Sequence, residues 1–215
     1  MPLRILVADD HPVVRRGVRA LLEEQADWQV CGEAATGREA VEQTKRLDPD
    51  IVVLDLSMPE LNGLDATRLI ARDAPRTQVL VLTMHRSEEL AHQVIRAGAR
   101  GYVLKSDADR ELVAAVDSLQ RCRSFRSPSL GTPALDARGG AQGEEGAGGW
   151  DDLTPREREI VQLVAEGRSS KEVAAGLGIS VKTVESHRTN VMRKLRIRSV
   201  TQLVRYAVRN GLVQA

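Results

Sequence analysis

Five short apolar runs recur along the first 105 residues, and each is followed by a segment with helical spacing. The runs are RILVA, QVCGEA, IVVLD, QVLVLT and GYVLK, at residues 4–8, 29–34, 51–55, 78–83 and 101–105. Strands that read as continuous apolar runs are typical of parallel sheets whose two faces are both covered by helices. Alternation of such strands with helices predicts an α/β fold. We therefore predict a doubly wound parallel sheet of five strands in this part of the chain.

Reactive side chains stand at the ends of four of these five strands. Asp9 and Asp10 follow the first strand, Asp55 ends the third, Thr83 the fourth and Lys105 the fifth. Ligands of open parallel sheets bind at the carboxyl ends of the strands, so we expect these side chains to converge. Clustered carboxylates repel one another unless a cation neutralises them, and oxygen ligands suit Mg²⁺ or Mn²⁺. The pattern predicts a metal site at which the Asp55 carboxylate could attack phosphorus.

The aspartates among these residues also have ordinary structural explanations, and Thr83 or Lys105 alone would indicate little. Asp9 and Asp10 could cap the helix that starts near Pro12, and Asp55 alone could end a strand at the surface. The presence of all five residues at the correct strand ends favours the chemical interpretation. We assign His11 to the start of the following helix rather than to the chemistry.

The last third of the chain has helical patterns and no strand pattern. The stretches TPRE at 154–157 and SSKE at 169–172 are capping boxes that start two helices, and Ser180 and Ser199 precede two more. We expect helices that reach about Ala165 and Leu177, and further helices over 181–195 and 199–210. Four short helices with short connections predict a small all-α domain that contains a helix-turn-helix.

A segment rich in Gly, Ala, Ser and Pro separates the two halves. The residues SFRSPSLGTPALDARGGAQGEEGAGG, at 124–149, predict a flexible linker between domains at 1–123 and 150–215. The first domain carries 17 basic and 20 acidic residues, whereas the second carries 12 basic and 7 acidic residues. The basic excess of the second domain indicates an anionic partner.

The predicted helix at 181–195 has one apolar and one polar face. A polar helix face can enter the major groove and read base edges, and here it consists of Lys182, Glu185, Ser186, Arg188, Thr189 and Asn190. Four more residues are placed for contacts with DNA phosphates, namely Lys171, Thr183, Arg193 and Lys194. His187 could either touch DNA or pack at the helix boundary. Taken singly, each charged residue could also be an ordinary surface group.

Several of these motifs carry a family resemblance. DD at 9–10, LDLSMPELNG at 54–63, LT at 82–83 and GYVLK at 101–105 resemble a response-regulator receiver domain, and residues 150–214 resemble the LuxR-type helix-turn-helix domain. Together they resemble the NarL/FixJ family of two-component response regulators. The resemblance implies the strand order 2-1-3-4-5.

The resemblance also implies a role for each residue of the site. Asp55 would be the phosphoacceptor; Asp9, Asp10, Asp55 and the backbone carbonyl of Ser57 would hold the metal; Thr83 and Tyr102 would be the switch pair; and Lys105 would bind the phosphoryl group. The implied partners are a sensor histidine kinase and promoter DNA, which the active protein would bind as a homodimer to regulate transcription.

Other functional classes fit the sequence less well. No apolar run approaches the roughly 18 residues that a membrane helix needs, and the N-terminus turns acidic early, so we expect a cytoplasmic protein without a membrane partner. A phosphatase built on an aspartyl-phosphate would need a second acid soon after Asp55, where Leu56 and Ser57 stand. We therefore expect no enzymatic activity beyond the receiver's own phosphoryl transfer and dephosphorylation. A regulator that needs no phosphorylation and a protein-interaction module stay open as alternatives.

Overall fold

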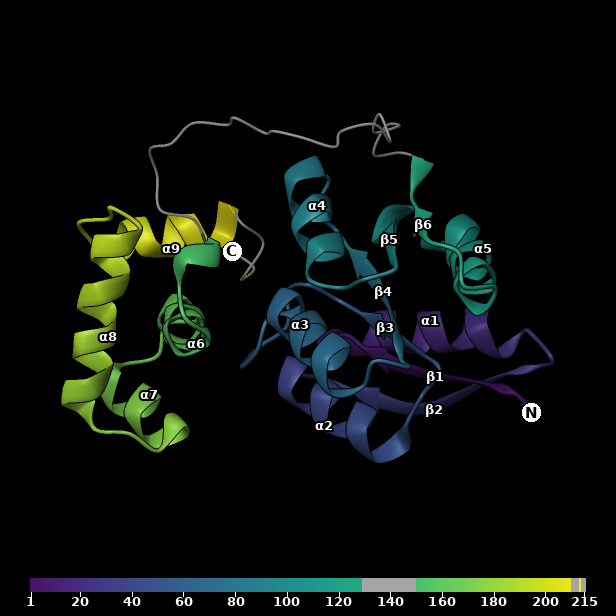
Figure 1. Cartoon of the computed structure of the whole chain (residues 1–215), viewed down its shortest axis with the longest axis horizontal. Helices are drawn as coiled ribbons and strands as arrows, with labels where there is room; N and C mark the ends of the chain where they lie inside the picture. Colours follow the sequence, from purple (N-terminus) through teal and green to yellow (C-terminus); the bar gives the residue numbers. More distant parts are fainter. Residues whose placement is uncertain (129–149, 210–212, 214–215) are drawn as a thin grey trace. The chain divides into compact units, whose positions relative to one another are not determined.

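The computed structural model describes residues 1–128, 150–209 and 213, and these residues fall into two compact units (Figure 1). The first unit contains the described residues up to 128, and the second contains those from 150 onward. Residues 129–149, which are most of the predicted linker, lie outside the described residues. Among the helices that are described, none combines the length and the apolar character needed to cross a membrane.

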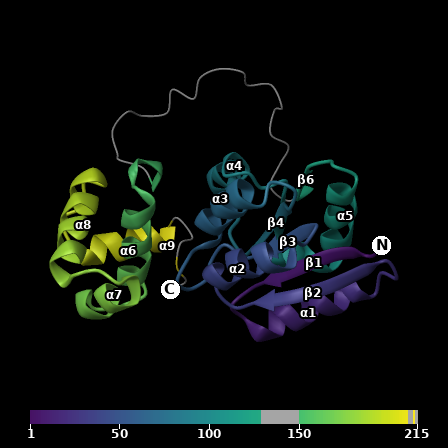
Figure 2. The same ribbon diagram turned by 60° about the horizontal axis from the view of Figure 1, so that its bottom comes forward.

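The first unit is a parallel sheet with helices on both faces (Figure 2). Its strands are β1 (Leu3–Ala8), β2 (Trp28–Ala34), β3 (Ile51–Leu54), β4 (Gln78–Thr83), β5 (Gly101–Leu104) and β6 (Phe125–Arg126). Its helices are α1 (Pro12–Glu23), α2 (Gly37–Leu47), α3 (Gly63–Asp73), α4 (Glu88–Arg96) and α5 (Ala108–Gln120), and a 3₁₀ turn, Lys105–Asp107, precedes α5. Helices α1 and α5 pack together on one face, while α2, α3 and α4 cover the other.

The observed strand order is β2-β1-β3-β4-β5-β6, and all neighbouring strands are parallel. The predicted order 2-1-3-4-5 is therefore confirmed, with one additional strand. In β6, Phe125 pairs with Gly101 and Arg126 pairs with Tyr102, inside the segment that the composition assigned to the linker. Two residues are too few to show an apolar alternation, so the sequence pattern does not reveal this strand.

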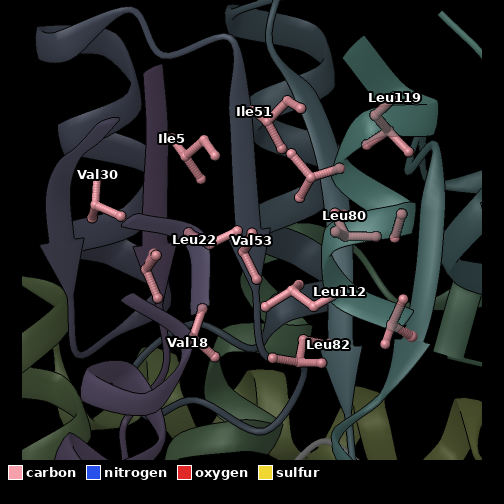
Figure 3. Packing of buried hydrophobic residues seen from close by; sticks show 14 residues of the cluster. Ile5, Val18, Leu22, Val30, Ile51, Val53, Leu80, Leu82, Leu112 and Leu119 are labelled. Carbon is pink, nitrogen blue, oxygen red and sulfur yellow. The ribbon is translucent and has the colours of Figure 1, made fainter. Parts of the chain in front are cut away.

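A continuous apolar core holds the strands in register. Ile5, Val53 and Leu80 project from β1, β3 and β4 toward Leu22 of α1 and Leu112 of α5, and all five are at most 1% exposed (Figure 3). Burying one such side chain contributes about 1.5–3 kcal/mol. Because this core fixes each strand along its whole length, the residues that follow the strands are held close together at one edge of the sheet.

The second unit consists of four helices in its described part, as the sequence predicts. They are α6 (Pro155–Ala165), α7 (Ser170–Leu177), α8 (Val181–Lys194) and α9 (Val200–Arg209), and a 3₁₀ turn, Trp150–Asp152, precedes them. Both predicted capping boxes form, between Thr154 and Glu157 and between Ser169 and Glu172. The side chain of Ser180 accepts a hydrogen bond from the Thr183 backbone and so caps α8. These local bonds satisfy backbone donors that a helix start otherwise leaves without partners.

A candidate phosphoryl site and a candidate nucleic-acid interface

The ends of β1, β3 and β5 bring two carboxylates and one ammonium into direct contact. Nζ of Lys105 lies 2.7 Å from Oδ2 of Asp9 and 2.8 Å from Oδ2 of Asp55. The residues Asp9 and Asp55 are each only 2% exposed, whereas Asp10 is partly exposed. Thr83, at the end of the neighbouring strand β4, is fully buried. The structure therefore places all five residues predicted from the strand ends at one edge of the sheet.

The charges of this cluster do not balance. Burial raises the pKa of Asp55, and the carboxylates of Asp9 and Asp10 raise it further, while Lys105 opposes the rise. Burial acts to lower the pKa of Lys105, but Asp55 and Asp9 outweigh this effect and the pKa is raised. The ammonium thus stays charged, yet it is one positive charge facing three acidic groups. A further cation would relieve the excess negative charge.

The donor atoms of the cluster fit a divalent metal ion. Asp9, Asp10, His11 and Asp55 each offer one ligand atom, and these four atoms lie within 4.8 Å of one another. Oδ2 of Asp9 is buried and, although ion-paired with Lys105, has no aligned hydrogen bond among the described residues. Carboxylate oxygens are the ligands that hard divalent cations prefer. The acidic cluster is therefore compatible with a bound divalent metal.

His11 has more contacts in the cluster than its sequence assignment indicates. It precedes α1, as expected, but its side chain makes no capping hydrogen bond. Instead, Nδ1 of its ring lies 2.7 Å from Oδ1 of Asp10, and its backbone N–H donates to Oδ1 of Asp9 over 2.9 Å. Its position directly after two aspartates was the available signal. The His11 ring therefore belongs to the acidic edge of the site as well as to the start of the helix.

His85, which the family resemblance places beside the site without a defined role, connects the two predicted switch residues. Its backbone N–H donates to Oγ1 of Thr83 over 3.2 Å, and its carbonyl accepts a hydrogen bond of 2.6 Å from the Tyr102 hydroxyl. Nε2 of its ring lies 3.1 Å from Oγ of Ser57, and burial lowers its pKa. Tyr102 is fully buried, which raises the pKa of its hydroxyl. One loop residue thus contacts Thr83, Tyr102 and Ser57.

The loop after Asp55 depends on a glycine. The Leu56 backbone N–H donates to Oδ1 of Asp55 over 2.8 Å and orients the carboxylate. Gly63 opens α3 so close to β3 that a Cβ atom there would lie 2.1 Å from the carbonyl oxygen of Asp55. Asn62 caps the same helix by accepting a hydrogen bond from the Asp65 backbone. The stretch LNG at 61–63 therefore lets the chain turn tightly beneath Asp55.

The candidate DNA-contacting residues lie mainly on the surface of α7 and α8. Seven of them are exposed, namely Lys171, Lys182, Glu185, Ser186, Thr189, Asn190 and Arg193, while Thr183, His187, Arg188 and Lys194 are partly buried. Two cations have partners inside the unit. Nζ of Lys194 lies 2.6 Å from Oε2 of Glu157, and the Arg188 guanidinium donates to Oγ of Ser170 over 2.9 Å. These contacts link α8 to α6 and α7 respectively.

An acidic site at the edge of a parallel sheet, together with a separate helix-turn-helix unit, defines a signalling receiver joined to a nucleic-acid reader. Residues 5–117 match the response regulator receiver domain, and residues 151–207 match the luxR family of bacterial regulatory proteins. The chain belongs to the two-component response regulators and carries a LuxR-type DNA-binding domain. The resemblance stated from the sequence motifs is confirmed.

Named relatives extend over the whole chain. Oxygen regulatory protein NreC of Staphylococcus carnosus is 39% identical over 98% of this chain and 99% of its own length. Transcriptional regulatory protein MctR of Rhizobium johnstonii is 37% identical over 98% of this chain and 95% of its own. The structure of the RcsB response regulator of Salmonella typhimurium has a TM-score of 0.59 and 29% identity, and covers 95% of this chain and 98% of RcsB. RcsB has also been solved as a complex with DNA and as two dimers on two parallel DNAs.

Proposed function

We propose that Asp55 accepts a phosphoryl group from a sensor histidine kinase, and that this transfer controls how the C-terminal domain binds promoter DNA. The observation that carries the proposal is the contact of Lys105 with both Asp9 and Asp55 at the buried edge of the sheet. A single ammonium shared by two buried carboxylates is an unusual arrangement for a purely structural ion pair, because an unbalanced buried charge is costly.

The proposed transfer needs one nucleophile and one leaving group. An oxygen of the Asp55 carboxylate attacks the phosphorus of a phosphohistidine, the P–N bond breaks, and its electron pair stays on the imidazole nitrogen of the kinase. An acyl phosphate forms on Asp55. Attack of water on the same phosphorus later releases inorganic phosphate and restores the carboxylate. The chain would catalyse these steps only on itself, so we do not propose an enzyme with separate substrates.

Side chains of the site have separate roles in this proposal. Asp9, Asp10 and Asp55, with the backbone carbonyl of Ser57, would hold Mg²⁺ or Mn²⁺. When bound, such an ion supplies positive charge that offsets the charge of the transferring phosphoryl oxygens. Lys105 supplies a second positive charge from the protein, and its ammonium already lies 2.8 Å from Asp55. After transfer, Lys105 would bind a phosphoryl oxygen.

The switch would pass through the loop after β4. Thr83 would donate its hydroxyl to a phosphoryl oxygen, and His85 would follow because its N–H is bonded to that hydroxyl oxygen. The carbonyl of His85 in turn holds the hydroxyl of Tyr102 in its inward position. Such coupling requires two states whose free energies differ by only a few kcal/mol.

The output would be the binding of a homodimer to two half-sites of promoter DNA. Support comes from the exposed polar face of α8 and from the RcsB structures with DNA and with dimers. The base-reading residues would be Lys182, Glu185, Ser186, Arg188, Thr189 and Asn190, with Lys171, Thr183, Arg193 and Lys194 near phosphates and His187 at the helix boundary. We propose domain limits of 1–123 and 150–215, and a cytoplasmic location where both kinase and DNA are accessible.

Phosphorylation and DNA binding can be tested together on the full-length chain. The protein is incubated with Mg²⁺ and acetyl phosphate, its intact mass is measured, and its affinity for a fragment of its own promoter is determined. We expect a phosphoryl adduct and tighter DNA binding, both absent in Asp55→Asn. Asp109→Asn, at an exposed aspartate, serves as the matched control and should behave as wild type. If neither acetyl phosphate nor a cognate kinase gives an adduct, phosphorylation is refuted.

A further inference from the structure

The outer edge of β5 is covered by residues that follow α5. The Phe125 N–H donates to the carbonyl of Arg100 over 3.0 Å, and the Ser127 N–H donates to the carbonyl of Tyr102 over 2.9 Å. The Ser127 side chain is buried, and its hydroxyl donates to the carboxylate of Glu111 on α5. The segment Phe125–Ser127 is thus attached to the strand that carries the switch tyrosine.

The two faces of this segment have different neighbours. Phe125 packs against the apolar core beneath α1 and α5. Arg126 projects to the opposite face, because successive residues of a strand alternate in direction, and its register partner is Tyr102. The Nε and Nη2 atoms of Arg126 are buried and have no hydrogen-bond partner among the described residues. Arg126 therefore stands beside Tyr102, and a ring that turned outward over this edge would meet it.

We propose that Phe125–Ser127 is a docking strand whose attachment to β5 is coupled to the inward position of Tyr102. Tyr102 is held inward by its hydrogen bond to His85, and the docked strand occupies the edge that an outward ring would cross. The coupling is reciprocal: whatever draws Tyr102 inward strengthens the attachment, and release of the strand frees the ring.

The biological role that we infer for the docking strand depends on the proposed function. Phosphoryl transfer to Asp55 would stabilise the hydrogen-bonded arrangement of Thr83, His85 and Tyr102 against the alternative with an outward ring, and would thereby tighten the attachment of residues 125–127. These residues come directly before the connection to the DNA-binding domain. When the strand is attached, the chain leaves the receiver at the edge of β5 rather than at the end of α5. Phosphorylation would therefore change the position at which the connection to the DNA-binding domain begins.

Hydrogen–deuterium exchange of the full-length protein tests the coupling to phosphorylation. We expect the amides of Phe125 and Ser127 to exchange about tenfold more slowly after treatment with Mg²⁺ and acetyl phosphate, a factor within the usual range of allosteric coupling. Asp55→Asn treated in the same way should show no change. The intact mass of the same sample separates the two proposals. An adduct with unchanged exchange overturns the coupling, whereas the absence of an adduct with both acetyl phosphate and a cognate kinase refutes the proposed function.

A second experiment decides on the docking strand without phosphorylation. The chain has 2 tyrosines, Tyr102 and Tyr206, so incorporation of 3-fluorotyrosine gives two fluorine resonances that Tyr206→Phe assigns. The double substitution Phe125→Ala/Ser127→Pro removes the core contact, the bond to the Tyr102 carbonyl and the bond to Glu111. We expect its Tyr102 resonance to shift toward that of a solvent-exposed ring and to broaden with a soluble relaxation agent.

Controls make the second experiment specific. Arg123→Ala removes an exposed cation two residues before the strand and should leave the Tyr102 resonance in place. Phe125→Leu, which keeps an apolar side chain, should do the same. An unchanged and protected Tyr102 resonance in the double variant would show that the ring does not depend on the strand, and the proposal would fail.

Discussion

The substitution Lys105→Met tests how strongly the stability of the receiver depends on the ammonium of Lys105 in the acidic cluster. The substitution keeps an unbranched side chain of similar length but removes the ammonium. Side-chain exposures are 9% for Lys105, 3% for Asp9 and 2% for Asp55, so the two carboxylates would be left buried without their counterion. We expect the receiver to lose stability for this reason rather than through lost packing.

The size of the loss follows from this burial. Breaking a buried ion pair by removing one partner costs about 3–5 kcal/mol. Asp55 can take up a proton once Lys105 is gone, because burial already raises its pKa, so we expect the lower end of this range. For a domain of about 120 residues, 3 kcal/mol corresponds to a Tm lower by about 12 °C.

Scanning calorimetry in EDTA and in Mg²⁺ measures the effect. The matched control is Lys45→Met, because Nζ of Lys45 lies 2.7 Å from Asp73 but the two side chains are 52% and 20% exposed. Solvent screens that pair, and its loss should cost at most about 1 kcal/mol. Mg²⁺ should recover part of the Tm of Lys105→Met, because it replaces the missing positive charge. If Lys105→Met melts in EDTA at the same temperature as Lys45→Met, the electrostatic reasoning is wrong.

Three further predictions concern other parts of the structure. Burial raises the pKa of Asp55 in the folded state, so its charged form destabilises the fold at neutral pH. Without metal, Asp55→Asn should therefore be more stable than wild type to denaturant at pH 7. This difference in the free energy of unfolding should shrink as the pH falls toward about 4, where the wild-type carboxyl is protonated as well. Gly63→Ala should lower the stability of the receiver by about 1–3 kcal/mol because the added Cβ clashes with the end of β3. Gly17→Ala, whose Cβ would lie in open space on α1, should stabilise the receiver by up to about 1 kcal/mol. Equal effects of the two substitutions would contradict the proposed clash at Gly63. Lys194→Ala should lower the Tm of the C-terminal unit because it breaks the ion pair with α6. Lys171→Ala, at an exposed residue proposed to contact phosphate, should leave the Tm unchanged and reduce the salt dependence of DNA binding by about one unit of slope.

The positions of the receiver residues could be predicted because they follow from strand ends. A continuous apolar run must end where the chain leaves the core, and in a parallel sheet all such ends lie on one edge. Asp9, Asp55, Thr83 and Lys105 could therefore be placed together without knowledge of any contact. Their chemical roles stay predictions, since they depend on a reaction and not on the fold.

Contacts between distant segments could not be predicted in the same way. The ring of His85 reaches Ser57, 28 residues earlier, and Lys194 reaches Glu157, 37 residues earlier. The spacing of apolar residues in the sequence does not indicate such a contact, because each contact depends on how two distant elements pack together. Lys194 illustrates the result: its sequence position on α8 suggests a phosphate contact, while in the structure its ammonium joins α8 to α6.

The strand order has a consequence for how the receiver is made. After β2, the order β1-β3-β4-β5-β6 follows the direction of synthesis, so each new strand pairs with a strand that has already left the ribosome. The sheet can thus grow by one strand at a time. At every stage its growing side presents one open edge, and such edges are sites of aggregation. The short β6, last to emerge, covers part of the last of these edges and so ends the growth of the sheet.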